Sequence, residues 1–164
     1  MTTSRTLRHV ALVGALAALG ASVPSTANEV PADSPATITT VAGPARGGSP
    51  TNTVDRVADF YGTYIDVLYD SGRNRLADSL RGHYLTKGLR DSLARWESAH
   101  HKDGVLRAKG VPIAWTAVYN DSGMGHCWTR VTLTWQDTGN RVHHTRLMVQ
   151  SDLATQLISG IKAA

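Results

Sequence analysis

The single cysteine of the 164-residue chain, Cys127, is the first candidate for covalent chemistry. Three states are open to a lone cysteine: a buried inert thiol, a disulfide to another chain, or a nucleophile. A nucleophilic thiol needs an imidazole within hydrogen-bond reach. The strand pairing predicted below sets Cys127 opposite Ser151 and His143 opposite Trp135, roughly 27 Å apart at about 3.4 Å per residue. We therefore favour a buried thiol, place the intermolecular disulfide second, and predict no catalytic residue.

Two pairs of adjacent histidines are candidate metal ligands, His100–His101 and His143–His144. Neighbours on a strand point to opposite faces, so His143 and His144 cannot bind one ion from regular β geometry. His100 and His101 lack the i, i+4 spacing of a helical metal site, and a helix C-terminus itself favours cationic side chains. We predict neither a metal nor a cofactor.

The first 27 residues are typical of an export signal. Arg5 and Arg8 precede a stretch of apolar or small residues, Val10–Val23, and Ser25–Ala27 has the small residues of a cleavage site. This stretch is too short to cross about 30 Å of hydrocarbon as a membrane anchor. We expect a secreted or cell-wall-associated protein with no membrane contact after cleavage.

The charge balance of the remaining chain offers no support for nucleic-acid binding. The sequence has 17 Lys+Arg and 13 Asp+Glu, and two of the arginines lie in the expected signal. The part from Asn28 onward therefore has a net charge of +2, without the clustered basic surface that nucleic acid requires. Residues 28–52 are rich in proline, glycine and small polar residues and predict a disordered linker or arm. Within this arm, Ala36–Val41 has strand propensity and would suit the open sheet edge of a partner.

Residues 53–164 predict a single α+β domain that begins with helices. Thr53 is expected to cap the first helix, which ends at Gly72 and has one apolar stripe. A second helical region is expected in two pieces, broken near Gly82 and Leu85–Thr86, after which Thr86 caps the longer piece. A basic connector follows over residues 105–110. The residues expected to face inward are Val54, Val57, Tyr61, Tyr64, Ile65, Leu68, Leu76, Leu80, Tyr84, Leu89, Leu93 and Trp96.

Three strands are predicted from alternating apolar and polar residues: Pro112–Tyr119, His126–Gln136 and Arg141–Gln150. Turn residues separate them at 120–125 and 137–140. A three-residue loop over 138–140 places the larger apolar residues on one face, whereas a one-residue slip would turn every side chain over. Residues 151–164 suit either a helix or a last strand over Gln156–Lys162.

This register predicts a sheet with two unlike faces, one of which helices must cover. The inner face carries Ile113, Trp115, Ala117, Tyr119, Val131, Leu133, Trp135, Leu147 and Val149. The aromatic residues between the helices and the sheet could form either a filled core or the lining of a ligand pocket. They are Tyr61, Tyr64, Trp115, Tyr119 and Trp135, with His143 beside them. The outer face carries residue types that are enriched at protein interfaces, so it is a candidate interaction surface. The alternative is that its arginine simply stacks on an exposed tryptophan and binds no partner. That surface comprises Trp128, Arg130, His144, Arg146 and Met148.

Residues 57–64, 83–90 and 157–161 resemble small secreted bacterial proteins of the cystatin-like, or nuclear-transport-factor-2-like, superfamily. Their sequences here are VADFYGTY, HYLTKGLR and LISGI. The resemblance extends over residues 53–161. It implies N-terminal helices packed on a curved antiparallel sheet of three to four strands, a cone whose outer face often mediates dimerisation. It implies no activity, because such folds serve as enzymes, ligand carriers and interaction domains.

Two functions remain as expectations. The first is a secreted, non-enzymatic binding or adaptor module that uses its outer sheet face and its arm for a secreted protein partner or a homodimer. The second is a small enzyme or ligand carrier with a site inside the cone. The second requires His143 to converge with a group such as Asp59, Asp66 or His83, because the predicted inner sheet face has no carboxylate. A filled core would favour the first.

Overall fold

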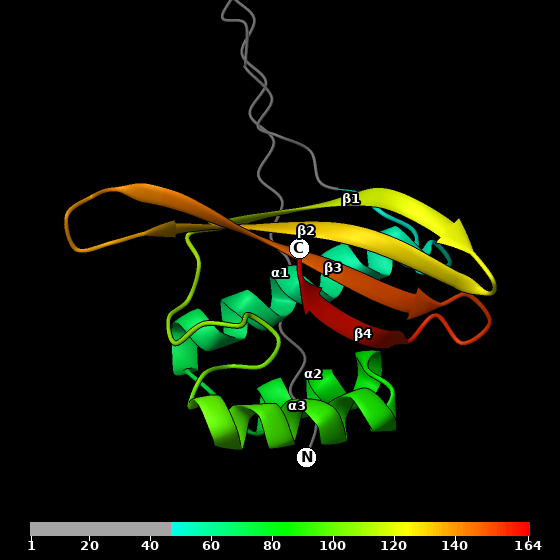
Figure 1. The fold of residues 1–164 in the computed structure, drawn as a ribbon, viewed down its shortest axis with the longest axis horizontal. Helices are drawn as coiled ribbons and strands as arrows, with labels where there is room; N and C mark the ends of the chain where they lie inside the picture. The colour runs from blue at the N-terminus through cyan, green and yellow to red at the C-terminus, as the bar shows by residue number, and fades with distance from the viewer. Residues whose placement is uncertain (1–46) are drawn as a thin grey trace, which may run out of the picture. The chain divides into compact units, whose positions relative to one another are not determined.

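The computed structural model describes residues 47–164, so the predicted export signal and the segment Ala36–Val41 lie outside the described residues. Three α-helices precede a four-stranded antiparallel sheet that is curved and unclosed, and all three helices lie on one face of it (Figure 1). This arrangement confirms the predicted α+β class. The elements are α1 (Thr53–Ser71), α2 (Arg75–Tyr84), α3 (Lys87–His100), β1 (Ala114–Gly123), β2 (His126–Gln136), β3 (Val142–Asp152) and β4 (Ile158–Ala163). Over the described residues, none of the helices combines the length and apolar character that a membrane span requires.

The helix ends follow local capping chemistry. The residue that caps α1 is Asn52 and not Thr53, because the Asn52 side chain accepts hydrogen bonds from the N–H groups of Val54 and Asp55. Gly72 ends α1 with φ at 65°, as predicted for a glycine at this position. Thr86 caps α3 as predicted, by accepting from Leu89 N–H.

The buried face of α2 differs from the predicted one. Leu76, expected inside, is 56% exposed, and the helix instead buries Ala77 and Arg81. It continues through Gly82 to Tyr84 and is separated from α3 at Leu85 and Thr86, so the break predicted at Leu85–Thr86 is present and the one near Gly82 is not. The apolar pattern failed here because a charged residue occupies an interior position, where acidic partners from other segments accept it.

The central strands pair in the predicted register. Trp135 lies opposite His143, Val131 opposite Leu147, and Cys127 opposite Ser151. Asn140 has a positive φ of 61° in the loop between β2 and β3, a conformation that asparagine tolerates better than most residues. The loop geometry and the apolar alternation therefore agree.

The first strand is longer than predicted. β1 continues through the expected turn to Gly123, and the chain reverses at Met124 and Gly125, whose φ values are 50° and 80°. A β-bulge between Tyr119 and Asp121 shifts the register. Tyr119 lies at this bulge and is 55% exposed, while Ile113 precedes the first strand pair and is 59% exposed. The prediction that both residues point into the core is wrong.

The tail forms a strand, one of the two alternatives predicted for it. β4 pairs with β3, and the intervening turn lies at residues 153–157 because β3 itself extends to Asp152. Ile158 connects β4 to the helical layer by accepting a hydrogen bond of 2.9 Å from Thr86 N–H. It also forms a parallel bridge with Leu85. The last strand thus joins the sheet to the helices.

The core lies between the helices and the inner face of the sheet. Aromatic residues of α1 fill its centre, and Phe60, Tyr61 and Tyr64 have no exposed surface. Two residues of the expected basic connector, Val105 and Leu106, are also buried, at 0% and 1% exposure. This segment is therefore part of the core and not a surface linker.

Candidate functional site

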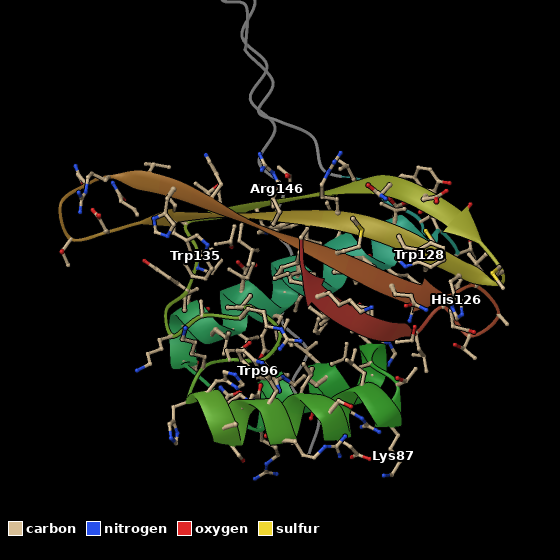
Figure 2. All side chains as sticks on the ribbon, viewed as in Figure 1. Lys87, Trp96, His126, Trp128, Trp135 and Arg146 are labelled. Carbon is tan, nitrogen blue, oxygen red and sulfur yellow. The ribbon has the colours of Figure 1, made fainter. Side chains whose placement is uncertain are left out.

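The described helices cover one face of the sheet and leave its outer face uncovered (Figure 1 and Figure 2). The strand register aligns its side chains in rows across the sheet. Arg130 lies opposite Met148, which lies opposite Lys162. In a neighbouring row, Thr132 lies opposite Arg146. The predicted interaction residues on β2 and β3 are therefore brought onto one surface, and β4 extends it.

Trp128 forms one wall of a small hollow on this face. Its cross-strand neighbour is Gln150, whose own neighbour is Gly160. These residues, with Met148 and Lys162, enclose a hollow of about 140 Å³. Gly160 contributes no side chain to this hollow, and a Cβ atom there would lie 3.4 Å from Gln150 Cβ. The contributions of Gln150, Gly160 and Lys162 were not predicted, because they depend on the residue-by-residue pairing of the last strand.

The outer face is basic. The side chains of Arg130, Arg146 and Lys162 are exposed, and none of them forms an ion pair within residues 47–164. His144 is exposed and its Nδ1 lies 3.1 Å from the hydroxyl of Thr134. Asp121 is the cross-strand neighbour of Trp128 and is the nearest acid in that row. A basic face of this kind favours a binding partner that carries acidic groups.

The residues predicted to line an inner pocket do not form one. Tyr61 and Tyr64 are core residues, and Tyr61 donates its hydroxyl to the Val105 carbonyl oxygen at 3.4 Å. Trp135 is buried, and its Nε1 donates to Thr145 Oγ1 at 2.9 Å. Exposed His143 stacks beside Trp135 at 6.4 Å between ring centroids. Tyr119 is at the surface, with its hydroxyl 2.9 Å from Ser122 Oγ.

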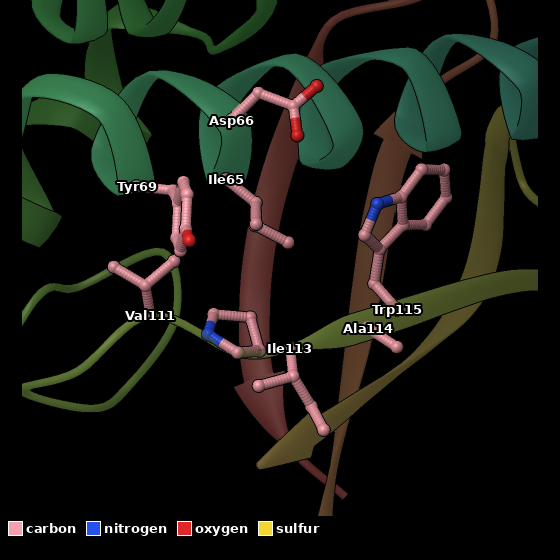
Figure 3. Close-up of a pocket in the computed structure, with 8 residues that line it drawn as sticks. Ile65, Asp66, Tyr69, Val111, Ile113, Ala114 and Trp115 are labelled. Atoms are coloured by element: carbon pink, nitrogen blue, oxygen red, sulfur yellow. The ribbon is translucent and has the colours of Figure 1, made fainter. Parts of the chain in front are cut away.

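Trp115 instead lines a groove between α1 and β1 (Figure 3). Two hollows of about 460 and 540 Å³ meet there, and both include Trp115 and Asp66. A Cβ atom on Gly62 of α1 would lie 2.7 Å from Trp115 Cζ2, so only glycine permits this contact. Asp59 and Asp66, proposed above as partners of His143, both line the groove, whereas His143 belongs to neither lining.

A buried polar network holds the helices together. Arg81 is 5% exposed and donates to the Tyr64 hydroxyl and to Asp103 Oδ2, from Nη2 at 2.6 and 2.8 Å respectively. The same nitrogen lies 2.7 Å from Glu97 Oε1. Tyr64 in turn donates to Asp103 Oδ2 at 2.6 Å. One guanidinium therefore connects α1, α2, α3 and the loop that follows.

The titration of this network follows from burial and pairing. Burial raises the pKa of Tyr64, and the carboxylate of Asp103 raises it further. Burial also raises the pKa of Glu97, but hydrogen bonds from Arg81 and from Gly104 N–H outweigh it and hold that pKa below its ordinary value. The Glu97 carboxylate therefore stays ionised beside Arg81. Every charged member has a partner, and the arrangement stabilises the fold without offering a free acid or base.

Cys127 is 4% exposed, and burial raises the pKa of its thiol. Both exposure and pKa oppose thiolate chemistry at this position. Across residues 47–164, no group of three or more histidine, cysteine or carboxylate side chains is placed to bind a metal. The His100 ring stacks on Trp96, with 4.2 Å between the ring centroids.

Comparison with known proteins adds a fold relationship. No protein-family model matches the chain, and no curated protein matches it. A solved structure of a protein of unknown function from Bacteroides thetaiotaomicron VPI-5482 is similar, with a TM-score of 0.50 and 21% sequence identity. The match covers 67% of this chain and 88% of that one. At this identity the likeness shows a shared α+β fold and nothing about activity.

Proposed function

We propose that the protein is a secreted, non-enzymatic binding module of the cystatin-like type, which holds a protein partner on its outer sheet face. Residues 28–52 would serve as its tether. The observation that supports this most strongly is the hollow beside Trp128 on a sheet face that no described helix covers. A tryptophan at such a position has the amphipathic surface that anchors many interfaces.

The charge of the face favours an acidic partner over a second copy. A homodimer with two-fold symmetry would bring the same surface of both copies together. Arg130 and Arg146 of one copy would then face the same arginines of the other, and like charges oppose association. A partner with carboxylates around an apolar side chain would fit both the arginines and the hollow. Self-association remains the alternative occupant of this face.

Affinity capture from culture supernatant tests the proposal when matched variants are compared. The bait is the chain from Asn28, and captured proteins are quantified by mass spectrometry. Trp128→Ala should lose about 2 kcal/mol of binding free energy, a fall of roughly 30-fold in affinity. Leu76→Ala removes an exposed apolar side chain from the helical side and is the matched control. A protein retained equally by all baits would contradict the proposal.

Light scattering after size exclusion addresses the homodimer separately. The chain from Asn28 should be monomeric, and Trp128→Ala and Arg146→Ala should leave its mass unchanged. A dimer that Trp128→Ala dissociates would show that the outer face binds a second copy. A dimer that persists in both variants would require a different interface.

An enzyme or ligand carrier with a site inside the cone has less support. Phe60, Tyr61 and Tyr64 fill the space between helices and sheet without exposed surface. The proposed convergent groups also lie in separate places, since His143 stacks beside Trp135 whereas His83 meets the Tyr84 ring edge to face.

A further inference from the structure

The groove between α1 and β1 lies on a different surface from the outer sheet face. We propose that it binds an extended segment of another protein that carries lysine or arginine side chains. The backbone of this segment would pair with the free edge of β1, and its cationic side chains would lie along α1. The inference does not depend on the function proposed for the outer face, because it uses other residues.

The first support is the open edge of the sheet. β1 pairs only with β2, and no other strand of residues 47–164 lies on its second side. The opposite edge is occupied, because Ile158 bridges to Leu85 and the Ile161 carbonyl accepts from Arg107 Nη2 at 2.7 Å. Proteins commonly protect a free edge with lysine, proline or a β-bulge. Ala114–Gly123 contains neither lysine nor proline, and its bulge lies after Tyr119. The stretch from Ala114 to Tyr119 is therefore a template for an added strand.

The second support is the shape and lining of the groove beside that edge. Its two hollows together run from Gly47 and Gly48 along α1 to Ile113. Figure 3 shows Tyr69 and Trp115 beside the opening, with Asp66 above them on α1. Tyr69 is 80% exposed, so an apolar part of a ligand would find uncovered aromatic surface there.

The third support is charge. The four aspartates of α1 recur at steps of four, seven and four residues, which places them on one face of the helix. They are Asp55, Asp59, Asp66 and Asp70. Asp59 and Asp66 line the groove and are exposed, and within the described part of the chain neither has an ion-pair partner. The described residues that line the two hollows include no lysine, arginine or histidine.

These charges also select among occupants. A second copy pairing through the same edge would place two acidic grooves beside each other, which like-charge repulsion opposes. The chain's own residues 28–46 carry two acids, Glu29 and Asp33, against one arginine, Arg46, so they do not complement the groove. A cationic extended segment from another protein matches both the backbone edge and the aspartates.

A synthetic peptide tests this inference directly. The probe is a labelled eight-residue peptide that alternates lysine with threonine or valine, titrated with the chain from Asn28 and followed by fluorescence anisotropy. We expect saturable binding, and no binding of the same peptide with glutamate for lysine. Methylating alternate backbone nitrogens keeps the charge but removes strand pairing, and should weaken binding roughly tenfold or more.

Matched variants assign the site. Asp59→Asn combined with Asp66→Asn should weaken peptide binding about fivefold, as expected for two exposed ion pairs. Asp91→Asn changes the charge of α3 by one and should have no effect, nor should Trp128→Ala on the outer face. Binding that ignores backbone methylation, or that Asp91→Asn weakens as much as the groove variants, would overturn the proposal. Binding that appears only after residues 28–46 are removed would identify the chain's own segment as the occupant and also overturn it.

Discussion

Gly62 of α1 and Trp115 of β1 are in such close contact that a Cβ atom on residue 62 would lie 2.7 Å from Trp115 Cζ2. The helix and the edge strand approach each other here because one of them has no side chain. This contact sets the depth of the groove, since it fixes where the indole lies.

Gly62→Ala should therefore destabilise the domain. Overpacking costs about 1–3 kcal/mol, and the better helix propensity of alanine returns roughly 0.5–1 kcal/mol of that. Urea unfolding measures the difference. The control is Gly88→Ala in α3, where nothing lies within 4 Å of the added Cβ and a gain of about 0.5–1 kcal/mol is expected. Equal effects of the two substitutions would refute the close contact.

Arg81→Met should be strongly destabilising. The substitution keeps much of the side-chain volume but removes the buried cation shared by Glu97 and Asp103, whose side chains are 19% and 15% exposed. Only the more exposed Arg73 then remains near them, at 3.5 Å from Glu97 and 3.9 Å from Asp103. Breaking a buried ion pair in this way costs about 3–5 kcal/mol. Arg75→Met, at an exposed position of the same helix, should change the free energy of unfolding by less than about 0.5 kcal/mol. Thermal and urea unfolding of both variants check the expectation.

The lowered pKa of Glu97 predicts a loss of stability in acid. A carboxyl whose pKa is lower in the folded than in the unfolded state stabilises the fold above its unfolded pKa, about 4.3. That contribution disappears as pH falls through the lower folded pKa. Glu97→Gln should therefore unfold with a weaker pH dependence below about pH 5 than the wild type. The unfolding free energies of both proteins are measured across the range in which carboxyl groups titrate, about pH 3 to 7. Parallel curves would show that Glu97 does not cause the loss of stability in acid.

Met124→Asn should stabilise the β1–β2 hairpin. Met124 has a φ of 50° and is 97% exposed, so it packs on nothing and occupies a strained backbone conformation. Asparagine followed by glycine is the preferred pair for a two-residue turn with both φ values positive, and Gly125 is already in place. We expect a gain of about 0.5–1 kcal/mol in unfolding free energy. A lower unfolding free energy for the variant would contradict the turn geometry.

The Cys127 thiol should react with a disulfide reagent far more slowly in the folded protein than in urea. Its side chain is 4% exposed, and burial raises its pKa, so little thiolate is presented to solvent. Non-reducing electrophoresis should then show a single chain. Rapid labelling of the folded protein, or a covalent dimer, would favour the intermolecular disulfide.

The central sheet was predictable because its signals are local. Alternating residues in β2 and β3, together with turn residues at 137–140, allowed only one register that keeps Val131, Leu133 and Leu147 on the same face. The first hairpin was harder, since glycines at both 123 and 125 could supply the turn. Only the pairing with β2 shows that the reversal occurs at Met124 and Gly125.

The site residues that were missed depend on contacts between distant segments. Arg81 sits inside α2 because Glu97 and Asp103 accept its charge, and nothing in the spacing of α2 indicates those partners. Lys162 joins the outer face only through its position opposite Met148, which requires the register of β4. Trp115 was correctly expected on the helix side, but its groove depends on Gly62 of another element.

The two borders of the sheet are unequal, and this limits how the protein can assemble. A filament built by strand pairing requires that both edge strands of each molecule be free to pair with a neighbour. Here the border formed by β4 is already bonded to Leu85, Thr86 and Arg107 of the same chain. Within residues 47–164, a strand added at β1 would therefore meet no equally free edge on the same molecule, which opposes growth of a filament through the backbone.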